Sequence, residues 1–414
     1  MSRLNELIQQ YCPDGVEYKK LGDVCDIKGR IGFRGYTRQD LVEEADGAIT
    51  LSPSNIINQE LNYEDCSYIS WAKYEESPEI KVAVGDVIFT KTASVGKTAL
   101  VKYLPKEATI NPQLVVLKNI QCNSAFLAYV LKTYRFQKEV AKLQGVGSVP
   151  NISQTSLSGI TIPIPPLPVQ EEIVRILDSF TELQAELQAE LQKRLQQYNY
   201  YRDKLLSFNE LNRWGQSVSV EWKKLGEICL KVCSGGTPSR GNSGYFTGDI
   251  PWLRTQEVDW KDIYDTEIKI TEDAVKNSSA KLIPENCVII AMYGATAGKV
   301  GINKIPLTTN QACCNLQINP QKALYKYVYY WVCNEYEHLK SLGQGSQNNI
   351  NAQIIKEYPI PIPPLAEQQR IVDILDRFDK LTTDITAGLP AEIEARRKQY
   401  EYYRDQLLTF KQKA

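Results

Sequence analysis

The sequence has very little histidine: a single residue, His338, in 414. One histidine hardly allows a histidine-based zinc site or a Ser-His-Asp triad. The ten cysteines are scattered and form no Cys-x2-Cys pair, so reduced, mostly buried thiols are expected and no metal site is predicted. The chain also lacks a long apolar run and a signal peptide, which predicts a cytoplasmic protein.

Two catalytic motifs are absent or incomplete. No Asn-Pro-Pro-Tyr sequence of an adenine methyltransferase is present. Residues 91–98 approach the phosphate loop G-x-x-x-x-G-K-[ST], but Lys91 occupies the first glycine position and the related segment 293–300 ends in Val300 in place of the hydroxyl residue. The favoured interpretation is that the chain is not an enzyme. The alternative is a nucleotide-dependent enzyme built on residues 91–98, which would lose ATP binding on Lys97→Ala.

The chain has almost no net charge, with 48 basic and 49 acidic residues. This balance does not by itself indicate nucleic-acid binding, although a whole-chain sum averages acidic helices with basic surfaces. Locally, Lys28, Arg30, Arg34 and Arg38 follow one another in a glycine-rich stretch. This stretch is predicted to be a basic loop.

The sequence contains an internal repeat. Residues 162–208 and 360–410 both open with IPIPPL, continue through ILD-x-F and close with YYRD-x-LL-x-F. Phe180 pairs with Phe378 at an offset of 198, whereas Tyr201 pairs with Tyr403 at an offset of 202. Four residues are therefore added mid-way, which is about one helical turn and about 6 Å of helix.

Each copy is predicted to be an extended proline run followed by a long amphipathic helix, because apolar residues recur every three or four positions. A helix of about 40 residues is about 60 Å long, so the two helical regions should pack on each other or on a partner. The four-residue repeat LQAE at 183–190 suggests a ruler. Gly388 and Pro390 interrupt the second copy and predict two helical pieces there.

The repeat extends beyond the helices. VEYKKLGDVC at 16–25 matches VEWKKLGEIC at 220–229, and residues 1–13 resemble a short amphipathic helix. Between these starts and the proline runs lie two segments rich in short β-like runs, such as 86–90 and 288–292. The predicted order is globule, rod, globule, rod, with boundaries at 1–14, 15–165, 166–212, 213–363 and 364–414.

Polar residues in the shared loops are the candidates for DNA contact. Arg suits guanine, Asn and Gln suit adenine, Ser and Thr suit several base edges, and Lys after a glycine turn suits phosphate. Each also has an ordinary structural explanation as a solvated or turn residue. The candidates are Lys28, Arg30, Arg34, Tyr36, Lys91, Ser94, Lys97, Asn111, Gln113 and Ser148 in the first globule, and Thr237, Arg240, Arg254, Tyr293, Thr296, Lys299, Asn310, Gln311, Ser346 and Gln347 in the second.

With these features the chain resembles the specificity subunit of type I restriction–modification systems. The paired helix openings and closings, the SGGTPS loop at 234–239 and GATAGK at 294–299 carry the resemblance, which covers nearly the whole chain. It implies an α+β fold in which two mixed α/β target-recognition domains are joined by two long antiparallel coiled-coil helices with pseudo-twofold symmetry. Each domain would read half of a bipartite DNA site.

The resemblance also implies partners. The helices would set the gap between half-sites and dock two methyltransferase subunits, which use S-adenosylmethionine to methylate adenine at N6. A restriction subunit using ATP and magnesium would complete the complex, and this chain would bind no cofactor itself. The expected coiled-coil and partner-contact residues are Leu177, Phe180, Leu187, Leu191, Leu195, Tyr201, Leu375, Phe378, Ile385 and Tyr403. A coiled-coil scaffold with no DNA role stays open as a third interpretation.

Overall fold

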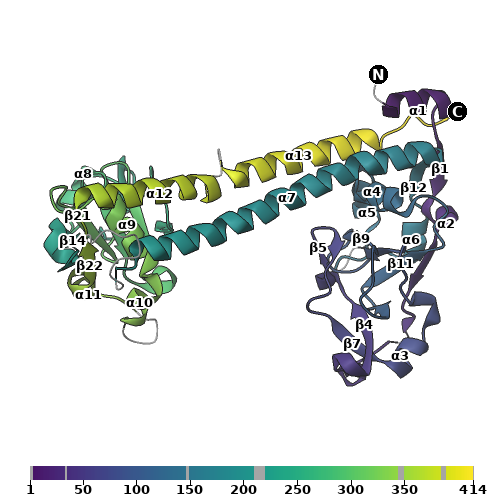
Figure 1. Ribbon diagram of the computed structural model, residues 1–414, viewed down its shortest axis with the longest axis horizontal. Helices are drawn as coiled ribbons and strands as arrows, with labels where there is room; N and C mark the ends of the chain where they lie inside the picture. The colour runs from purple at the N-terminus through teal and green to yellow at the C-terminus, as the bar shows by residue number, and fades with distance from the viewer. Residues whose placement is uncertain are drawn as a thin grey trace. The chain divides into compact units, whose positions relative to one another are not determined.

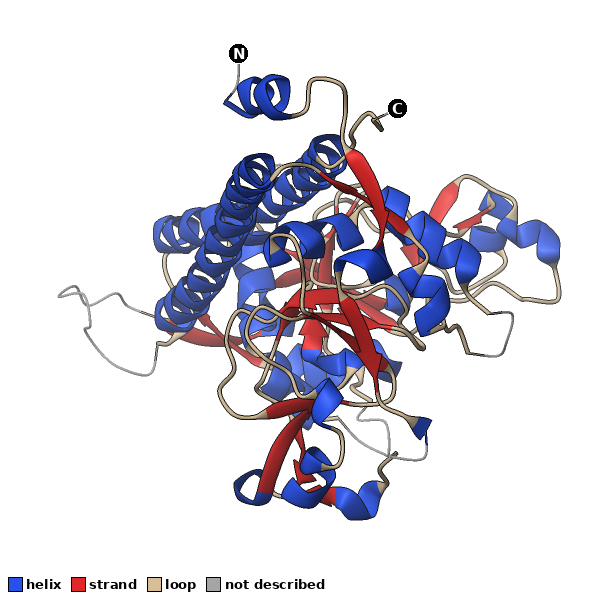
Figure 2. Cartoon of the chain, turned by 90° about the vertical axis from the view of Figure 1, so that its right-hand side faces the viewer, coloured by secondary structure: helices blue, strands red, loops and turns tan. Residues whose placement is uncertain are grey.

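The computed structural model of the chain describes residues 3–32, 35–145, 149–208, 220–343, 349–383 and 388–413. The fold divides into two compact units: unit 1 comprises 1–188 with 392–414, and unit 2 comprises 189–391. Both units contain helices and strands, which confirms the predicted α+β class; Figure 2 shows the two kinds of element in the chain. The units are defined by contacts within the fold, and the predicted sequence boundaries of the domains stay a prediction.

Unit 1 begins with the predicted N-terminal helix and continues as a sheet-rich domain (Figure 1). Its elements are α1 Arg3–Tyr11, β1 Glu17–Lys20, α2 Leu21–Val24, β2 Asp26–Gly29, β3 Leu41–Val42, β4 Gly47–Leu51, β5 Ile56–Ile57, β6 Glu60–Leu61, β7 Ser67–Ser70, α3 Trp71–Glu75, β8 Val87–Thr90, β9 Thr98–Leu100, β10 Ala108–Ile110, β11 Leu114–Lys118, α4 Ser124–Lys132, α5 Tyr134–Leu143, α6 Gln154–Ser158 and β12 Thr161–Ile164.

Two four-stranded sheets make up most of unit 1, in the orders β2-β11-β8-β9 and β10-β4-β7-β3. The predicted strand at 86–90 is β8, whose four residues are all buried. At the boundary of the domain, β1 pairs antiparallel with β12, so that Glu17 lies opposite Ile164. The start of the domain is thus joined to the segment that leads into the long helix.

Unit 2 has the same plan, as expected from the repeat. Its elements are β13 Glu221–Lys224, β14 Cys229–Ser234, β15 Ile250–Leu253, β16 Asp262–Ile263, β17 Lys269–Ile270, α8 Glu272–Lys276, β18 Val288–Ala291, β19 Val300–Asn303, β20 Thr308–Thr309, β21 Cys313–Ile318, α9 Tyr325–Asn334, α10 Tyr336–Ser341, α11 Ala352–Glu357 and β22 Pro359–Ile362. The sheets run β14-β21-β18-β19-β16 and β17-β15-β20. Strand β13 pairs with β22, repeating the pairing of β1 with β12.

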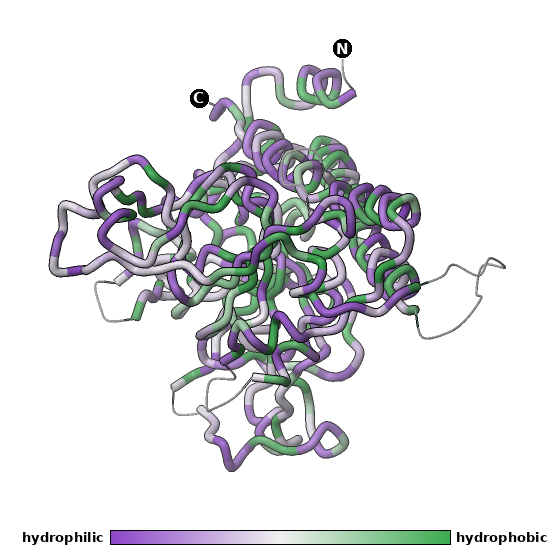
Figure 3. Tube along the Cα trace, turned by 90° about the vertical axis from the view of Figure 1, so that its left-hand side faces the viewer, coloured by the Kyte–Doolittle hydropathy of each residue, from purple (hydrophilic) through white to green (hydrophobic). Residues whose placement is uncertain are grey.

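Three long helices form the helical regions: α7 Leu167–Leu206, α12 Leu365–Thr383 and α13 Leu389–Leu407. Helix α7 begins directly after Pro165 and Pro166. A proline disfavours the helical conformation in the residue before it, so the helix does not extend further towards the N-terminus. The two separate helices α12 and α13 confirm the two pieces predicted from Gly388 and Pro390. Hydrophilic and hydrophobic residues alternate along these helices (Figure 3), as expected for amphipathic helices that bury one face.

Candidate nucleic-acid interface

In unit 1, several predicted DNA-contacting residues gather where β8 ends and β11 begins. These strands are antiparallel, with Thr90 opposite Leu114. Lys91 and Gln113 are therefore neighbours, and the Lys91 backbone N–H donates to the Gln113 carbonyl at 2.9 Å. Partial burial lowers the pKa of the Lys91 amine. The geometry brings a lysine and an amide together at one edge of the sheet.

Unit 2 has the equivalent edge with different side chains. The Met292 backbone N–H donates to the Ala312 carbonyl at 2.8 Å, between the end of β18 and the start of β21. Tyr293 is 41% exposed there, and Gln311 is exposed beside it. The Thr237 hydroxyl, from the predicted glycine-rich loop, donates to the Gln311 side chain. The same backbone scaffold therefore carries Lys91 and Gln113 in one unit and Tyr293, Gln311 and Thr237 in the other.

Asn111 and Asn310 hold the turns before β11 and β21. The Asn111 side-chain oxygen accepts from the Gln113 backbone N–H at 2.9 Å, and Asn310 accepts from Ala312 at 3.1 Å. An asparagine in this position stabilises the turn by imitating a backbone hydrogen bond. This geometry gives both residues a structural role at the edge of each sheet.

The predicted basic loop is partly buried. Arg30 is 5% exposed, and its guanidinium donates to the Ile110 carbonyl at 3.2 Å and to the Thr109 hydroxyl at 3.3 Å. It also lies 5.2 Å from the centre of the Tyr36 ring, whose hydroxyl is 3.2 Å from that of Thr50. Burial lowers the pKa of Arg30. Arg30 thus joins the end of β2 to β10, a structural role that the sequence did not indicate.

The two turn lysines make contacts within their own units. Lys97 donates to the backbone carbonyls of Pro53 and Ile56 at 3.3 and 3.4 Å. Lys299 forms an ion pair with Asp259 at 2.6 Å. Both contacts lie near the surface, where an ion pair typically contributes less than about 1 kcal/mol.

The structure contradicts the nucleotide-site alternative at residues 91–98. A phosphate loop leads into a helix, whose N-terminal N–H groups bind the phosphate. Here Thr98 begins the strand β9, and its buried hydroxyl donates back to the Gly96 carbonyl at 3.2 Å. Gly96 has φ +100°, the left-handed conformation that a tight hairpin turn requires.

The remaining candidates vary in exposure. Ser94 and Arg240 are exposed, Lys28 and Thr296 are partly buried, and Arg254 is paired with Glu257 at 3.3 Å and with Glu267. Arg34, Ser148, Ser346, Gln347 and Ile385 lie outside the described residues. DNA contact by any of these candidates stays a prediction.

Sequence reasoning missed the residues that fix each domain to its long helix. In unit 1, Gln170 on α7 is 3% exposed; its side-chain oxygen accepts from the Asn123 backbone N–H at 2.9 Å and its amide donates to the Pro165 carbonyl at 2.7 Å. Two turns further along α7, Asp178 accepts from the Tyr129 hydroxyl at 2.5 Å. These bonds connect α7 to the start and the middle of α4.

Unit 2 repeats this arrangement. Gln368 is fully buried, accepts from the Leu324 backbone N–H at 2.9 Å and donates to the Pro363 carbonyl at 2.8 Å. Asp376 accepts from the Tyr330 hydroxyl at 2.7 Å. The glutamine and the aspartate both recur at an offset of 198 in the helix openings. This recurrence is the sequence signal that marks both residues, although it does not name the groups that they bond.

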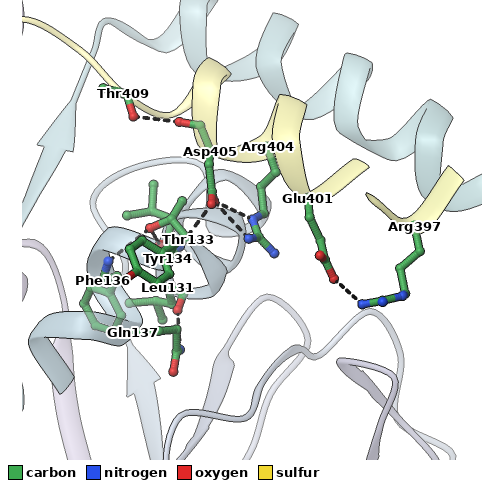
Figure 4. A network of polar contacts seen from close by, with 11 residues as sticks. Leu131, Thr133, Tyr134, Phe136, Gln137, Arg397, Glu401, Arg404, Asp405 and Thr409 are labelled. Atoms are coloured by element: carbon green, nitrogen blue, oxygen red, sulfur yellow. Dashed lines mark hydrogen bonds and ion pairs between the residues drawn. The ribbon is translucent and has the colours of Figure 1, made fainter. Parts of the chain in front are cut away.

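The Arg-Asp pair of the YYRD closing contacts the same domain from the opposite helix. In unit 1, Asp405 on α13 accepts from the Tyr134 backbone N–H at the start of α5 at 3.2 Å and from Arg404 at 3.0 Å (Figure 4). In unit 2, Arg202 on α7 donates to its neighbour Asp203 and to the Asn334 side chain at the end of α9. Each domain is therefore held by the opening of one repeat and the closing of the other.

Aromatic ring contacts also join the opening of one repeat to the closing of the other. Phe180 on α7 stacks on Tyr403 of α13 with centroids 5.6 Å apart, and Tyr201 on α7 stacks on Phe378 of α12 at 5.6 Å. Leu177 and Leu375 are fully buried in the two domain cores, and Leu187, Leu191 and Leu195 are partly buried along α7. Within each unit the helices run antiparallel (Figure 1).

Among the described residues, no cluster of three or more histidine, cysteine, aspartate or glutamate side chains is placed to hold a metal ion. Within the same residues, no helix is long and apolar enough to cross a membrane.

The sequence matches a protein-family model over most of its length. The model describes the type I restriction modification DNA specificity domain, and it matches twice, at residues 13–197 and 218–395. The chain belongs to the specificity-subunit family of type I restriction–modification systems. Each match covers one of the two related segments that begin at residues 16 and 220, together with most of the helical region that follows it.

Known specificity subunits are similar in sequence. The chain is 45% identical over 272 residues to the EcoR124I/EcoR124II specificity subunit of Escherichia coli, an alignment that covers 63% of this chain and 65% of that subunit. A putative type I specificity subunit of Haemophilus influenzae is 35% identical over 308 residues, covering 70% of this chain and 72% of the relative. The chain thus spans just under two thirds of the Escherichia coli subunit in this match.

Solved structures share the fold of this specificity subunit. A chain from work on complex assembly and conformational transition of the type I R-M system aligns with a TM-score of 0.62 at 18% identity, covering 96% of this chain and 98% of the other. The S subunit from M. genitalium aligns with a TM-score of 0.54 at 15% identity, covering 95% and 96%. These neighbours confirm the predicted arrangement of two mixed domains with long helices.

The specificity subunit also contains a desolvated lysine, Lys132 at the end of α4, which donates to the Gln59 carbonyl at 3.2 Å. Burial lowers its pKa to about 8. Because the folded-state pKa lies below the unfolded value of about 10.5, the cost of burying the charged amine is fully present below about pH 8 and disappears as the pH rises towards 10.5.

We expect Lys132→Met to remove this pH dependence. Between pH 7.5 and 10, the unfolding free energy of the wild type should rise by on the order of 2 kcal/mol more than that of Lys132→Met. Urea unfolding of both proteins across this range measures the difference, with the exposed Lys138→Met as the control. A difference that is constant with pH would contradict the prediction.

Proposed function

We propose that this specificity subunit binds double-stranded DNA at a bipartite target, with one half-site read by each of its two domains. The chain performs no chemistry in this proposal. Its loops contact base edges in the major groove, where Asn and Gln suit adenine and Arg suits guanine, while lysines contact phosphate. The gap between the half-sites is set by the helical regions.

One observation carries the proposal: the two units repeat one scaffold but present different side chains at the same edge. The anchoring glutamines Gln170 and Gln368 bond equivalent groups in the two repeats: a backbone N–H at the start of a helix and a proline carbonyl. At the sheet edge, by contrast, the backbone bonds that Lys91 and Gln113 make in unit 1 are made in unit 2 by Met292 and Ala312. A protein that binds two different half-sites with two similar domains needs this combination. The shared scaffold places each domain on the DNA in the same orientation, and the different loop side chains select different bases.

The partners follow from the family. We propose that the helices dock two methyltransferase subunits, which bind S-adenosylmethionine and methylate adenine at N6, and that a restriction subunit using ATP and magnesium joins the complex. This chain holds none of these cofactors in the proposal. The complex would act on the nucleoid in the cytoplasm of a bacterium or archaeon.

Single-molecule methylome sequencing tests the proposal. The chain is expressed with the methyltransferase encoded beside it, in a host that lacks other adenine methylation. The expected result is a split motif with N6-methyladenine in each half, which vanishes when this chain is omitted. Methylation that does not depend on the chain contradicts the proposal.

The scaffold interpretation makes a different prediction for the same complex. If the helices only assemble partner subunits, target DNA and shuffled DNA of equal composition bind equally. A competition experiment at fixed salt measures this ratio, because phosphate contacts alone are salt-dependent and insensitive to sequence. Specific recognition predicts a preference of at least about 1,000-fold.

A further inference from the structure

Unit 1 contains a cavity between its domain and its long helices. The cavity has a volume of about 570 Å³ and is lined by residues of the β5–β6 hairpin, α4, α7 and α13, all of which belong to unit 1. This volume lies within the range of about 300–1,000 Å³ that is typical of small-molecule sites. Four aromatic rings line it: Tyr63, Tyr103, Tyr129 and Tyr400. The cavity therefore offers ring faces and edges to an aromatic ligand.

The equivalent helix of unit 2 carries a larger side chain at a position that lines the cavity in unit 1. Tyr129 on α4 and Tyr330 on α9 bond equivalent aspartates, so these two helices correspond at an offset of 201. At this offset, the small Ala128 that lines the cavity corresponds to Tyr329. An alanine thus stands in unit 1 where unit 2 has an aromatic ring.

Tyr329 occupies in unit 2 the space that is open in unit 1. Burial raises the pKa of its phenol, and three neighbouring groups raise it further. These groups are the repeat equivalents of residues that line the cavity: Cys333 for Lys132, Asp379 for Thr181 and Tyr198 for Tyr400. The cavity is therefore a feature in which the two similar units differ.

Most charged side chains around the cavity are paired within unit 1. The pairs are Lys102 with Glu60 at 2.7 Å, Arg397 with Glu401 at 2.7 Å and Arg404 with Asp405 at 2.9 Å, of which Figure 4 shows the last two. Asp178 accepts a hydrogen bond from the Tyr129 hydroxyl, and Glu182 is exposed to solvent.

Lys132 differs from these cations. Within the part of the chain that the structure describes, its amine forms no ion pair and donates to the Gln59 carbonyl at 3.2 Å. Burial lowers the pKa of this amine to about 8, and the nearby cations Lys102 and Arg404 lower it too. A desolvated cation is normally paired with an anion, because leaving it unpaired costs free energy. The cavity thus presents one cation that lacks an anionic partner.

We propose that this cavity binds a small aromatic carboxylate, with the carboxylate on the Lys132 amine and the ring among the tyrosines. A carboxylate beside a desolvated ammonium group forms a charge-assisted hydrogen bond, which is stronger than a neutral one. A single unpaired cation favours a ligand with one negative charge over a phosphate monoester, which carries nearly two. The ligand contacts the domain and both helices of unit 1, so it should stabilise their attachment. This site does not depend on the binding of DNA.

Indole-3-acetate is the probe, and isothermal titration calorimetry with the full chain at pH 7 measures its binding. We expect a dissociation constant of about 1 mM or below, the affinity of a modest ligand of this size. Indole-3-acetamide lacks the charge and acetate lacks the ring, so both should bind at least about tenfold more weakly. The proposal is overturned if the wild type does not bind indole-3-acetate, or if it binds the amide equally well.

Two variants locate the probe. Lys132→Met removes the cation, and Ala128→Tyr introduces the ring that unit 2 carries at the equivalent position. Each should weaken the binding of indole-3-acetate by at least about tenfold, whereas the exposed Lys138→Met should leave it unchanged. Thermal unfolding shows whether each variant folds, and either folded variant decides the question by itself. Unchanged binding in a folded Lys132→Met or Ala128→Tyr variant contradicts the assigned site.

Discussion

We expect the deletion of residues 187–190 to move methylation from the wild-type sites to sites with the same half-sites and a gap shorter by one or two base pairs. The deletion removes about 6 Å of helix, against about 3.4 Å of DNA per base pair. It also turns the rest of α7 by about 40° relative to a whole number of turns, a small change that keeps Leu191 and Leu195 on the same side.

The loss at the old sites should be large. A domain displaced by about 6 Å loses several base contacts at once, and each mismatched base pair costs about 1–3 kcal/mol. We therefore expect methylation at wild-type sites to fall at least about 100-fold in the methylome measurement. Glu186→Ala, an exposed change in the same helix that preserves its length, is the control. Methylation that keeps the old gap would show that α7 does not set it.

Replacing Gln368 with alanine should loosen the attachment of the unit 2 domain to α12. The side chain is fully buried and bonds the Leu324 N–H and the Pro363 carbonyl. Its removal leaves two backbone groups unsatisfied and a cavity beside them, at a cost of about 3 kcal/mol in unfolding free energy. Since Leu324 immediately precedes α9, the start of that helix should open first.

Hydrogen exchange measures this effect locally. The peptide that contains the Leu324 amide should exchange at least about 100-fold faster in Gln368→Ala, because about 3 kcal/mol corresponds to two powers of ten. Gln369→Ala is a matched control, since the neighbouring Gln369 is exposed and its side chain donates to Asp373 within the same helix. Equal exchange in the two variants would mean that the buried glutamine does not anchor the domain.

Local patterns predicted the helical elements well. The long helix of 40 residues and the division at Gly388 and Pro390 follow from periodicity and from proline chemistry, which act over neighbouring residues. The same holds for the hairpin turn at Gly96, whose positive φ favours glycine.

Predictions of exposure were less successful, because burial depends on residues far away in the sequence. Arg30 stands in a glycine-rich basic stretch that predicts a basic loop and a DNA contact, yet its guanidinium bonds Thr109 and Ile110, about 80 residues later. Lys97 similarly bonds the carbonyls of Pro53 and Ile56. No pattern in the residues around Arg30 or Lys97 predicts these distant hydrogen-bond partners.

The sequence by itself determined the repeat, the amphipathic helices, their interruption and the family, since each depends on residue order or on contacts within a few residues. Only the tertiary structure decided which side chains anchor the domains and which lie at the sheet edges. Gln170 and Asp178 read as polar residues of an ordinary helix until α4 packs on them. The role of a polar side chain depends on the group that folding brings next to it. Here that group lies far away in the sequence, so a local sequence pattern does not predict it.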